Sequence, residues 1–173
     1  MNRFLLISSL ISVALLSGCA SAPKPLRGEF AQILPAQAGT QAPIGQRVRW
    51  GGEIVAVDTQ ASRSCFELLG KPLNESARPS RADETAGRFL ACRDGFYDPA
   101  LFEVGRDLTV VGIIESIEPR LIGGFEYRYP RVAAEVIYLW PPRDPYRMRP
   151  VGFWVGQHGN AWLGHWTPIY LPY

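Results

Sequence analysis

The feature that most constrains the fold is a series of five short β-rich runs separated by turn residues. These runs are rich in Val, Ile and aromatic residues, which favour strands. They cover roughly residues 48–57, 64–69, 88–92, 108–117 and 127–139. The chain shows no strongly amphipathic helix, and parallel sheets require long crossover helices. We therefore expect a mainly β fold in which neighbouring strands pair directly.

Glycine and proline indicate how these strands bend and turn. Gly51-Gly52 interrupts the first run, which is typical of a bulge or a sharp bend. Gly112 lies within the fourth run, and all three glycines are expected to serve the curvature of a barrel and not the approach of a ligand. A helical turn is expected after Asp98-Pro99, and residues 119–124 are expected to turn the chain. Pro130 is expected at an edge or a bulge. This order matches an OB-fold, a five-stranded partly open barrel, with a general β-sandwich as the alternative.

The first residues have the pattern of a secretory signal. Arg3 precedes an apolar run over residues 4–16, which is shorter than the roughly 20 residues of a membrane-spanning helix. The run ends in Leu16-Ser17-Gly18-Cys19, which resembles the lipobox of bacterial lipoproteins. That resemblance implies cleavage before Cys19 and lipidation of its thiol, and several acyl chains anchor a protein stably. The alternative is an ordinary secretory signal with a chance cysteine.

The residue after Cys19 bears on location. In the lipoprotein class an Asp at this position favours retention in the inner membrane, and this chain has Ala20. The resemblance therefore implies a lipid anchor in the outer membrane, with the protein facing the periplasm.

Composition divides the chain into four parts. Residues 1–18 are the expected signal peptide, and residues 19–44, rich in Ala, Pro, Gln and Gly, are an expected lipidated tether with a short helix near residues 30–34. Residues 45–140 carry the barrel. Residues 141–173 form a tail rich in proline and aromatic residues.

The aromatic side chains of the tail suit a membrane interface or a binding surface. The expected contacts with the membrane or a partner are Trp154, Trp162, Trp166 and Tyr170. Alternatively, the tail folds back and covers the open face of the barrel. The sequence is compatible with both interpretations.

Besides Cys19, the mature chain contains two cysteines, Cys65 and Cys92. We place them on neighbouring strands, and the periplasm is oxidising, so a disulfide between them is predicted. Free or buried thiols are the alternative. A metal site is not expected, because no Cys-x-x-Cys or nearby histidine accompanies them.

Charge and motifs limit the possible chemistry. After signal removal 17 basic side chains face 16 acidic ones, so no attraction to nucleic acid is expected. A groove for an anionic ligand lined by Arg49, Arg88 and Arg106 is one hypothesis, and structural pairing of these arginines is the other. Trp50 is expected in the core. No catalytic signature is present, and the histidines, His158 and His165, lie in the tail, so we expect no catalytic residue, metal or cofactor.

The middle of the chain resembles the Slp family of outer-membrane lipoproteins. The matching residues include Gly45-x-x-Val48-Arg49-Trp50-Gly51-Gly52-x-Ile54, Gly87-Arg88-Phe89-Leu90-Ala91, Gly95-Phe96-x-Asp98-Pro99, Thr109-Val110-Val111-Gly112 and Tyr127-x-Tyr129-Pro130. The resemblance implies a non-enzymatic binding or scaffolding role in the envelope under starvation or stress. The alternatives are an accessory subunit that docks through the aromatic tail, and an enzyme acting on cell-wall or lipid material.

Overall fold

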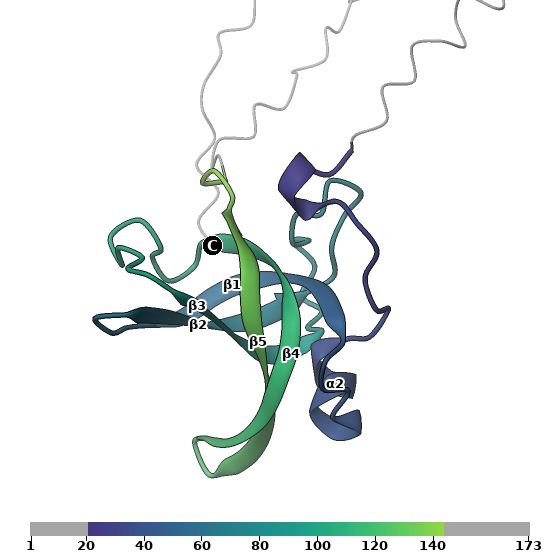
Figure 1. Ribbon diagram of the computed structural model, residues 1–173, viewed down its shortest axis with the longest axis vertical. Coiled ribbons are helices and arrows are strands. Elements are labelled where there is room, and N and C mark those ends of the chain that lie inside the picture. Colours follow the sequence, from purple (N-terminus) through teal and green to yellow (C-terminus); the bar gives the residue numbers. More distant parts are fainter. Residues whose placement is uncertain (1–20, 144–173) are drawn as a thin grey trace, which may run out of the picture. The chain divides into compact units, whose positions relative to one another are not determined.

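The computed structural model describes residues 21–143, and these form a five-stranded closed β-barrel (Figure 1). The strands are β1 (Arg47–Thr59), β2 (Arg63–Lys71), β3 (Gly87–Asp94), β4 (Asp107–Ile122) and β5 (Phe125–Leu139). A 3-10 helix, η1 (Lys24–Leu26), and a short helix, α2 (Pro35–Gln41), precede them. The prediction of a mainly β, OB-fold-like barrel is confirmed.

The long strand β1 and one short parallel ladder close the barrel. The first half of β1 pairs with β4 and its second half with β2, so the order around the barrel is β1-β2-β3-β5-β4. Between β3 and β5 only three residue pairs meet, from Leu90–Arg131 to Cys92–Ala133, and they are parallel. The sheet is therefore closed where a partly open one was expected, although its closing seam is short.

Two strand glycines allow the close strand crossings that this small barrel needs. A Cβ at Gly52 would collide with the backbone oxygen of Leu69, and a Cβ at Gly112 with that of Ala133. The ladder between β4 and β5 also shifts register at Val111/Gly112. Both glycines therefore serve the curvature of the barrel, as expected, and the register shift of β1 lies at Ile54/Ala56 and not at Gly51-Gly52.

The barrel interior is filled by alternating side chains from all five strands. Trp50, expected in the core, is buried, and its ring meets that of Phe89 edge-on at 5.3 Å between centroids. The indole Nε1 donates to the backbone oxygen of Ile33 at 2.7 Å, so the one polar atom of the ring is satisfied. The main buried residues of this core are Val48, Trp50, Ile54, Phe66, Leu68, Phe89, Leu108, Val110, Ile114 and Val132.

The expectation of a tether over residues 19–44 is wrong for its described part, because residues 21–44 pack on the barrel. Ala22 and Leu26 are buried in a second apolar cluster with Ala77, Val111 and Trp140. The helix lies at Pro35–Gln41 and not at residues 30–34. The physical reason is that β4 is buried on both faces between Leu108 and Gly112, so its outer face needs a cover.

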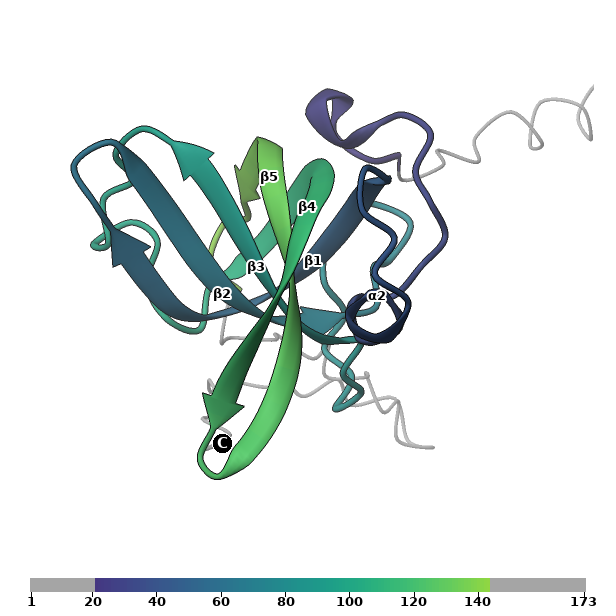
Figure 2. The same ribbon diagram turned by 60° about the horizontal axis from the view of Figure 1, so that its bottom comes forward.

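The β4–β5 hairpin is longer than expected and projects from the barrel (Figure 2). The two strands remain paired as far as Ile122 and Phe125, so only Gly123 and Gly124 turn the chain. Pro119 is tolerated because β1 pairs with β4 only up to Ile113, which leaves an edge beyond that point. The expected helical turn near residue 98 is an isolated turn, with the N–H of Phe102 bonded to Asp98.

Candidate ligand-binding site

A cavity of about 380 Å³ lies on the outer surface of the barrel, beside the β4–β5 hairpin. Alternation along β2 turns Arg63, Cys65 and Glu67 outward, while Phe66 and Leu68 point into the core. The lining residues are Ala56, Val57, Asp58, Gln60, Arg63, Cys65, Glu67, Leu90, Arg120 and Arg131. Most of the lining side chains are therefore polar, and all of them except Gln60 are carried by strands.

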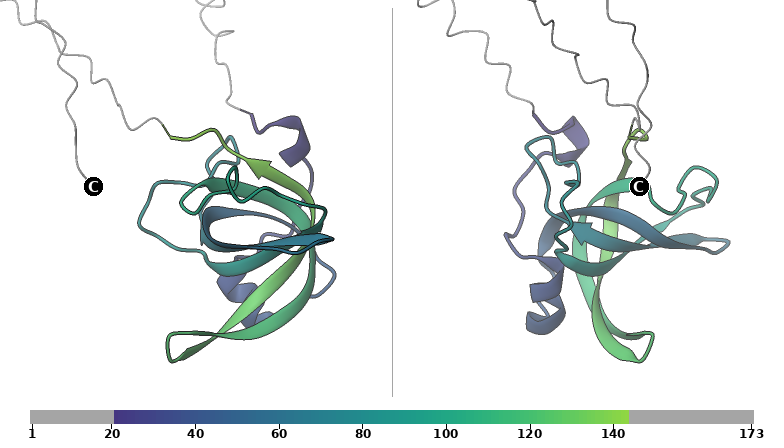
Figure 3. Two further views of the ribbon diagram at one scale, coloured as in Figure 1. Left: turned by 90° about the vertical axis from the view of Figure 1, so that its left-hand side faces the viewer. Right: turned by 180° about the vertical axis from the view of Figure 1, so that it is seen from behind.

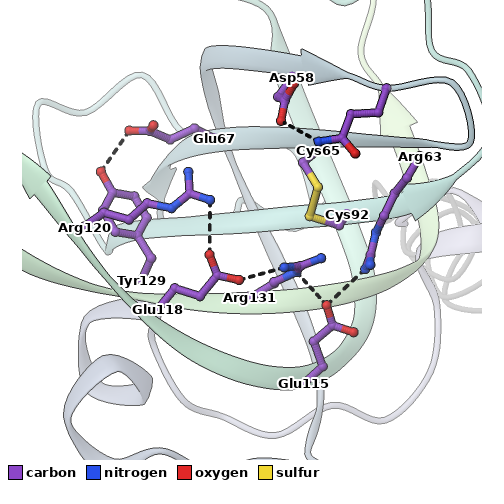
Figure 4. A network of polar contacts seen from close by, with 11 residues as sticks. Asp58, Arg63, Cys65, Glu67, Cys92, Glu115, Glu118, Arg120, Tyr129 and Arg131 are labelled. Atoms are coloured by element: carbon purple, nitrogen blue, oxygen red, sulfur yellow. Dashed lines mark hydrogen bonds and ion pairs between the residues drawn. A yellow bond between two sulfur atoms is a disulfide. The ribbon is translucent and has the colours of Figure 1, made fainter.

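A chain of ion pairs runs along one side of this cavity (Figure 4). Glu115 contacts Arg63 at 3.0 Å and Arg131 at 2.7 Å. Glu118 contacts Arg131 at 2.7 Å and Arg120 at 3.1 Å. The register shift between Ile114 and Ser116 leaves Glu115 without a cross-strand partner, which makes room for it to meet arginines from two strands.

A second set of polar side chains is centred on Glu67. Its Oε1 accepts hydrogen bonds from the Tyr129 hydroxyl at 2.9 Å and from Arg88 at 2.6 Å. Burial, followed by the hydrogen bond to Glu67, raises the pKa of Tyr129. The Tyr129 hydroxyl therefore stays protonated at neutral pH and is a donor to Glu67, which lines the cavity.

The ion pair between Glu118 and Arg131 favours the charged form of both side chains. Burial alone would raise the pKa of Glu118, but hydrogen bonds from Arg131 and Arg120 outweigh it, and the net effect is a lowered pKa. The hydrogen bond to Glu118 raises the pKa of Arg131. Four acidic side chains, Asp58, Glu67, Glu115 and Glu118, thus balance four arginines, Arg63, Arg88, Arg120 and Arg131. The site is highly polar but carries no net charge.

A disulfide joins Cys65 and Cys92 at the wall of the cavity. The two residues are direct partners in the β2–β3 ladder, with their Cα atoms 4.1 Å apart. The bridge links the strands that carry Arg63 and Glu67 on one side and Arg88 on the other. It therefore restrains the two strands from which these polar side chains project.

The arginines singled out from the sequence do not converge. Arg49 donates to the backbone oxygen of Leu26 at 2.9 Å and lies 4.9 Å from the Phe30 ring centroid. Arg106 donates to the backbone oxygen of Trp140 at 2.8 Å. Arg88 pairs with Glu67. The hypothesis of one groove lined by all three is therefore wrong, because each guanidinium holds a different part of the fold.

Sequence reasoning missed Arg63, Arg120 and Arg131. For Arg63 a signal existed, since its alternation with Cys65 and Glu67 predicts one shared outward face. Arg120 and Arg131 could not be found in this way, because they reach the cavity only through the long hairpin and its register shift.

A second cavity, of about 350 Å³, lies between the N-terminal segment and the barrel. Its walls are largely apolar, with Phe30, Ile33, Trp50 and Leu73 among them, and Arg49 and Lys71 at its polar side. Both cations already bond to backbone oxygens, Arg49 to Leu26 and Lys71 to Ala82. We therefore regard the first cavity as the better candidate for ligand binding.

Several predicted site residues lie outside the described range. These are Cys19, Trp154, Trp162, Trp166 and Tyr170, together with His158 and His165. Between residues 21 and 143, no cluster of three or more His, Cys, Asp or Glu side chains is arranged to hold a metal ion. Within the same range, no helix has the length and apolarity needed to cross a membrane.

Comparison with known proteins identifies the family. The model of the outer membrane lipoprotein Slp family matches residues 16–171. The uncharacterized lipoprotein YeaY of Escherichia coli (strain K12) is 30% identical over 162 residues, which cover 86% of this chain and 83% of the relative. Outer membrane protein Slp of the same organism is 27% identical over 137 residues, covering 75% of this chain and 71% of the relative. No solved structure matches the chain significantly. The chain therefore belongs to the outer membrane lipoprotein Slp family and is a lipid-anchored protein of the outer membrane.

Proposed function

We propose that this protein is a non-enzymatic binding module, attached to the outer membrane through lipid on Cys19 and facing the periplasm, and that its ligand is a glycan. The observation that carries the proposal is the polar cavity on the outer face of β2, beside the β4–β5 hairpin. OB-folds bind oligonucleotides and oligosaccharides on the face of their second and third strands, between the β1–β2 and β4–β5 loops. Gln60 and Arg120 place this cavity between the same two hairpins.

Charge balance favours a neutral glycan over an anionic ligand. Polyanions bind to surfaces where positive charge is in excess. By contrast, the charged residues that line this cavity, taken together with their ion-pair partners, are four arginines and four carboxylates. Paired guanidinium and carboxylate groups still offer many fixed donors and acceptors. Such groups suit the hydroxyl and amide groups of a sugar chain.

The same ion pairs favour binding over catalysis. A general acid at neutral pH needs a carboxyl with a raised pKa. Arginines lower the pKa of Glu118, and Glu67 is engaged by Arg88 and Tyr129. These carboxylates are arranged as hydrogen-bond acceptors and not as proton donors.

Calorimetric titration of the detergent-solubilised protein tests the proposal. The neutral probe is a tetrasaccharide of N-acetylglucosamine, and the anionic probe is a heparin tetrasaccharide. We expect the neutral probe to bind and the anionic one to bind far more weakly. Gln60→Ala should weaken binding about fivefold, since one hydrogen bond contributes ~1 kcal/mol.

Gln41→Ala is the matched control, because Gln41 is also exposed but ends α2, outside the cavity. Equal weakening by both substitutions would place the binding site elsewhere. Failure of the neutral probe to bind, or a preference for heparin, would contradict the proposed ligand.

The Slp relationship further supports a proposal that this binding serves the envelope during starvation or stress. A strain lacking the protein should then lose envelope integrity in stationary phase and keep it during growth. Dye uptake by the two cultures measures the difference, and equal uptake would contradict this role.

A further inference from the structure

The segment that links the folded domain to its expected lipid anchor is very short. Ser21 is the first described residue, and only Ala20 separates it from Cys19. An extended chain covers at most about 3.6 Å per residue, so the Cys19 attachment point lies within about 7 Å of Ser21. A domain held so closely cannot turn freely above a membrane in the way that a domain on a long tether can.

Arg27 holds this first segment in place. Its Nε donates to the backbone oxygen of Ala22 at 2.6 Å, and its Nη2 donates to the Ser21 hydroxyl at 2.9 Å. Ala22 is only 9% exposed, and Leu26 beside it is fully buried in the outer apolar cluster. Ser21 and Ala22, the described residues nearest the anchor, are therefore attached to the folded body.

The segment lies at one end of the domain. The loop between β2 and β3 packs beside it, since Ala77 shares the apolar cluster of Leu26. The tip of the β4–β5 hairpin lies at the opposite end in each view (Figures 1–3). From Val111, which shares that cluster, to Ile122 at the tip, β4 runs about 36 Å at ~3.3 Å per residue.

We infer that the domain stands on the inner surface of the outer membrane in one orientation, with η1 and the loop carrying Ala77 against the phospholipid headgroups. Arg27 is the positioning residue. Lys24, exposed on η1, adds a positive charge that suits anionic headgroups. The hairpin tip, with exposed Leu121 and Phe125, then points away from this membrane. The inference rests on the lipid attachment at Cys19 proposed above, but not on the proposed ligand.

Depth-dependent fluorescence quenching tests this orientation. The acylated, disulfide-bonded protein contains no free thiol, so the fluorophore reacts only with a single cysteine that is added by substitution. Glu75→Cys labels the exposed loop near η1, and Gly124→Cys labels the hairpin tip, where an added side chain meets nothing within 4 Å. In vesicles of phosphatidylethanolamine and phosphatidylglycerol with nitroxide-labelled headgroups, we expect strong quenching at residue 75 and none at residue 124.

Two changes should abolish this difference. The first is a Gly/Ser insert of about 12 residues between Ala20 and Ser21, which behaves as a flexible coil of about 20 Å. The second is Arg27→Ala, with Arg81→Ala as its matched control. Arg81 is exposed and makes no hydrogen bond or ion pair within residues 21–143.

The experiment distinguishes a failure of the lipid anchor from a failure of the proposed orientation. Intact mass first shows whether Cys19 carries lipid, and an unmodified Cys19 overturns the anchor itself. With Cys19 acylated, equal quenching at residues 75 and 124 overturns the orientation. Persistence of the difference in Arg27→Ala assigns it to the short chain alone and overturns the role of Arg27.

Discussion

At the scale of single residues, Gly112 shows how one missing side chain permits the barrel. It lies where β4 shifts register against β5, and the backbone oxygen of Ala133 occupies the place of its Cβ. A flexible neighbouring side chain could move away from an added methyl group, but a carbonyl within a strand ladder cannot. The glycine is therefore needed for close strand approach and not for an unusual backbone angle.

We predict that Gly112→Ala destabilises the protein by about 3 kcal/mol, the upper end of the usual cost of overpacking. Urea denaturation followed by tryptophan fluorescence measures the loss. Gly124→Ala is the control, because nothing lies within 4 Å of its added Cβ. Equal stability of the two variants would show that the β4–β5 crossing can open at little cost.

At the scale of elements, the β4–β5 hairpin brings the charged network together. Its ladder shift frees Glu115, and diagonal pairing lets Glu118 reach Arg131 from the facing strand. Arg63, from β2, completes the chain through Glu115. The hairpin thus joins the polar wall of the cavity to the rest of the barrel.

This network predicts a loss of stability in acid. The pKa of Glu118 is lowered below its ordinary value of 4.5 in the folded state, so its ion pairs stabilise the fold fully above that value. Stability is lost as pH falls through the lower, folded pKa. The free energy of unfolding should therefore fall between pH 5 and pH 3 by about 0.5–1 kcal/mol more in the wild type than in Glu118→Gln, because the pair is partly exposed.

Denaturation at each pH measures this difference, and Glu126→Gln is the control. Glu126 is exposed on the same hairpin and has no ion pair within residues 21–143. If Glu118→Gln and Glu126→Gln follow the wild-type curve equally, Glu118 does not stabilise the fold through its charge.

At the scale of the whole molecule, the barrel is incomplete without the segment that precedes it. Residues 22–30 cover the outer face of β4 and β5, and Trp50 needs the backbone oxygen of Ile33. The outer layer also contains a polar link, in which the Trp140 indole donates to Thr109 and Thr109 donates to Ala77. The folded unit therefore begins near Ser21 and not at the first strand.

We predict that Leu26→Ala lowers the free energy of unfolding by about 3 kcal/mol, as for other buried leucines. Leu34→Ala, at a side chain in the same segment that is 50% exposed, should change it by less than about 0.5 kcal/mol. Thermal and urea unfolding of both variants compare the two. A small effect of Leu26→Ala would mean that residues 21–44 act as a tether after all.

The sequence by itself determined the five strands, their bends at glycine and the burial of Trp50, because these depend on side-chain alternation and local backbone freedom. Only the tertiary structure decided which charged groups meet and what covers the outer face of β4. Arg63 and Glu115 are 52 residues apart, and their meeting depends on barrel closure and a single register shift. Leu26 reads as part of a polar, proline-rich tether until its partners Val111 and Trp140 are brought to it. Such contacts arise from strand pairing over long sequence distances, and a local sequence pattern cannot predict them.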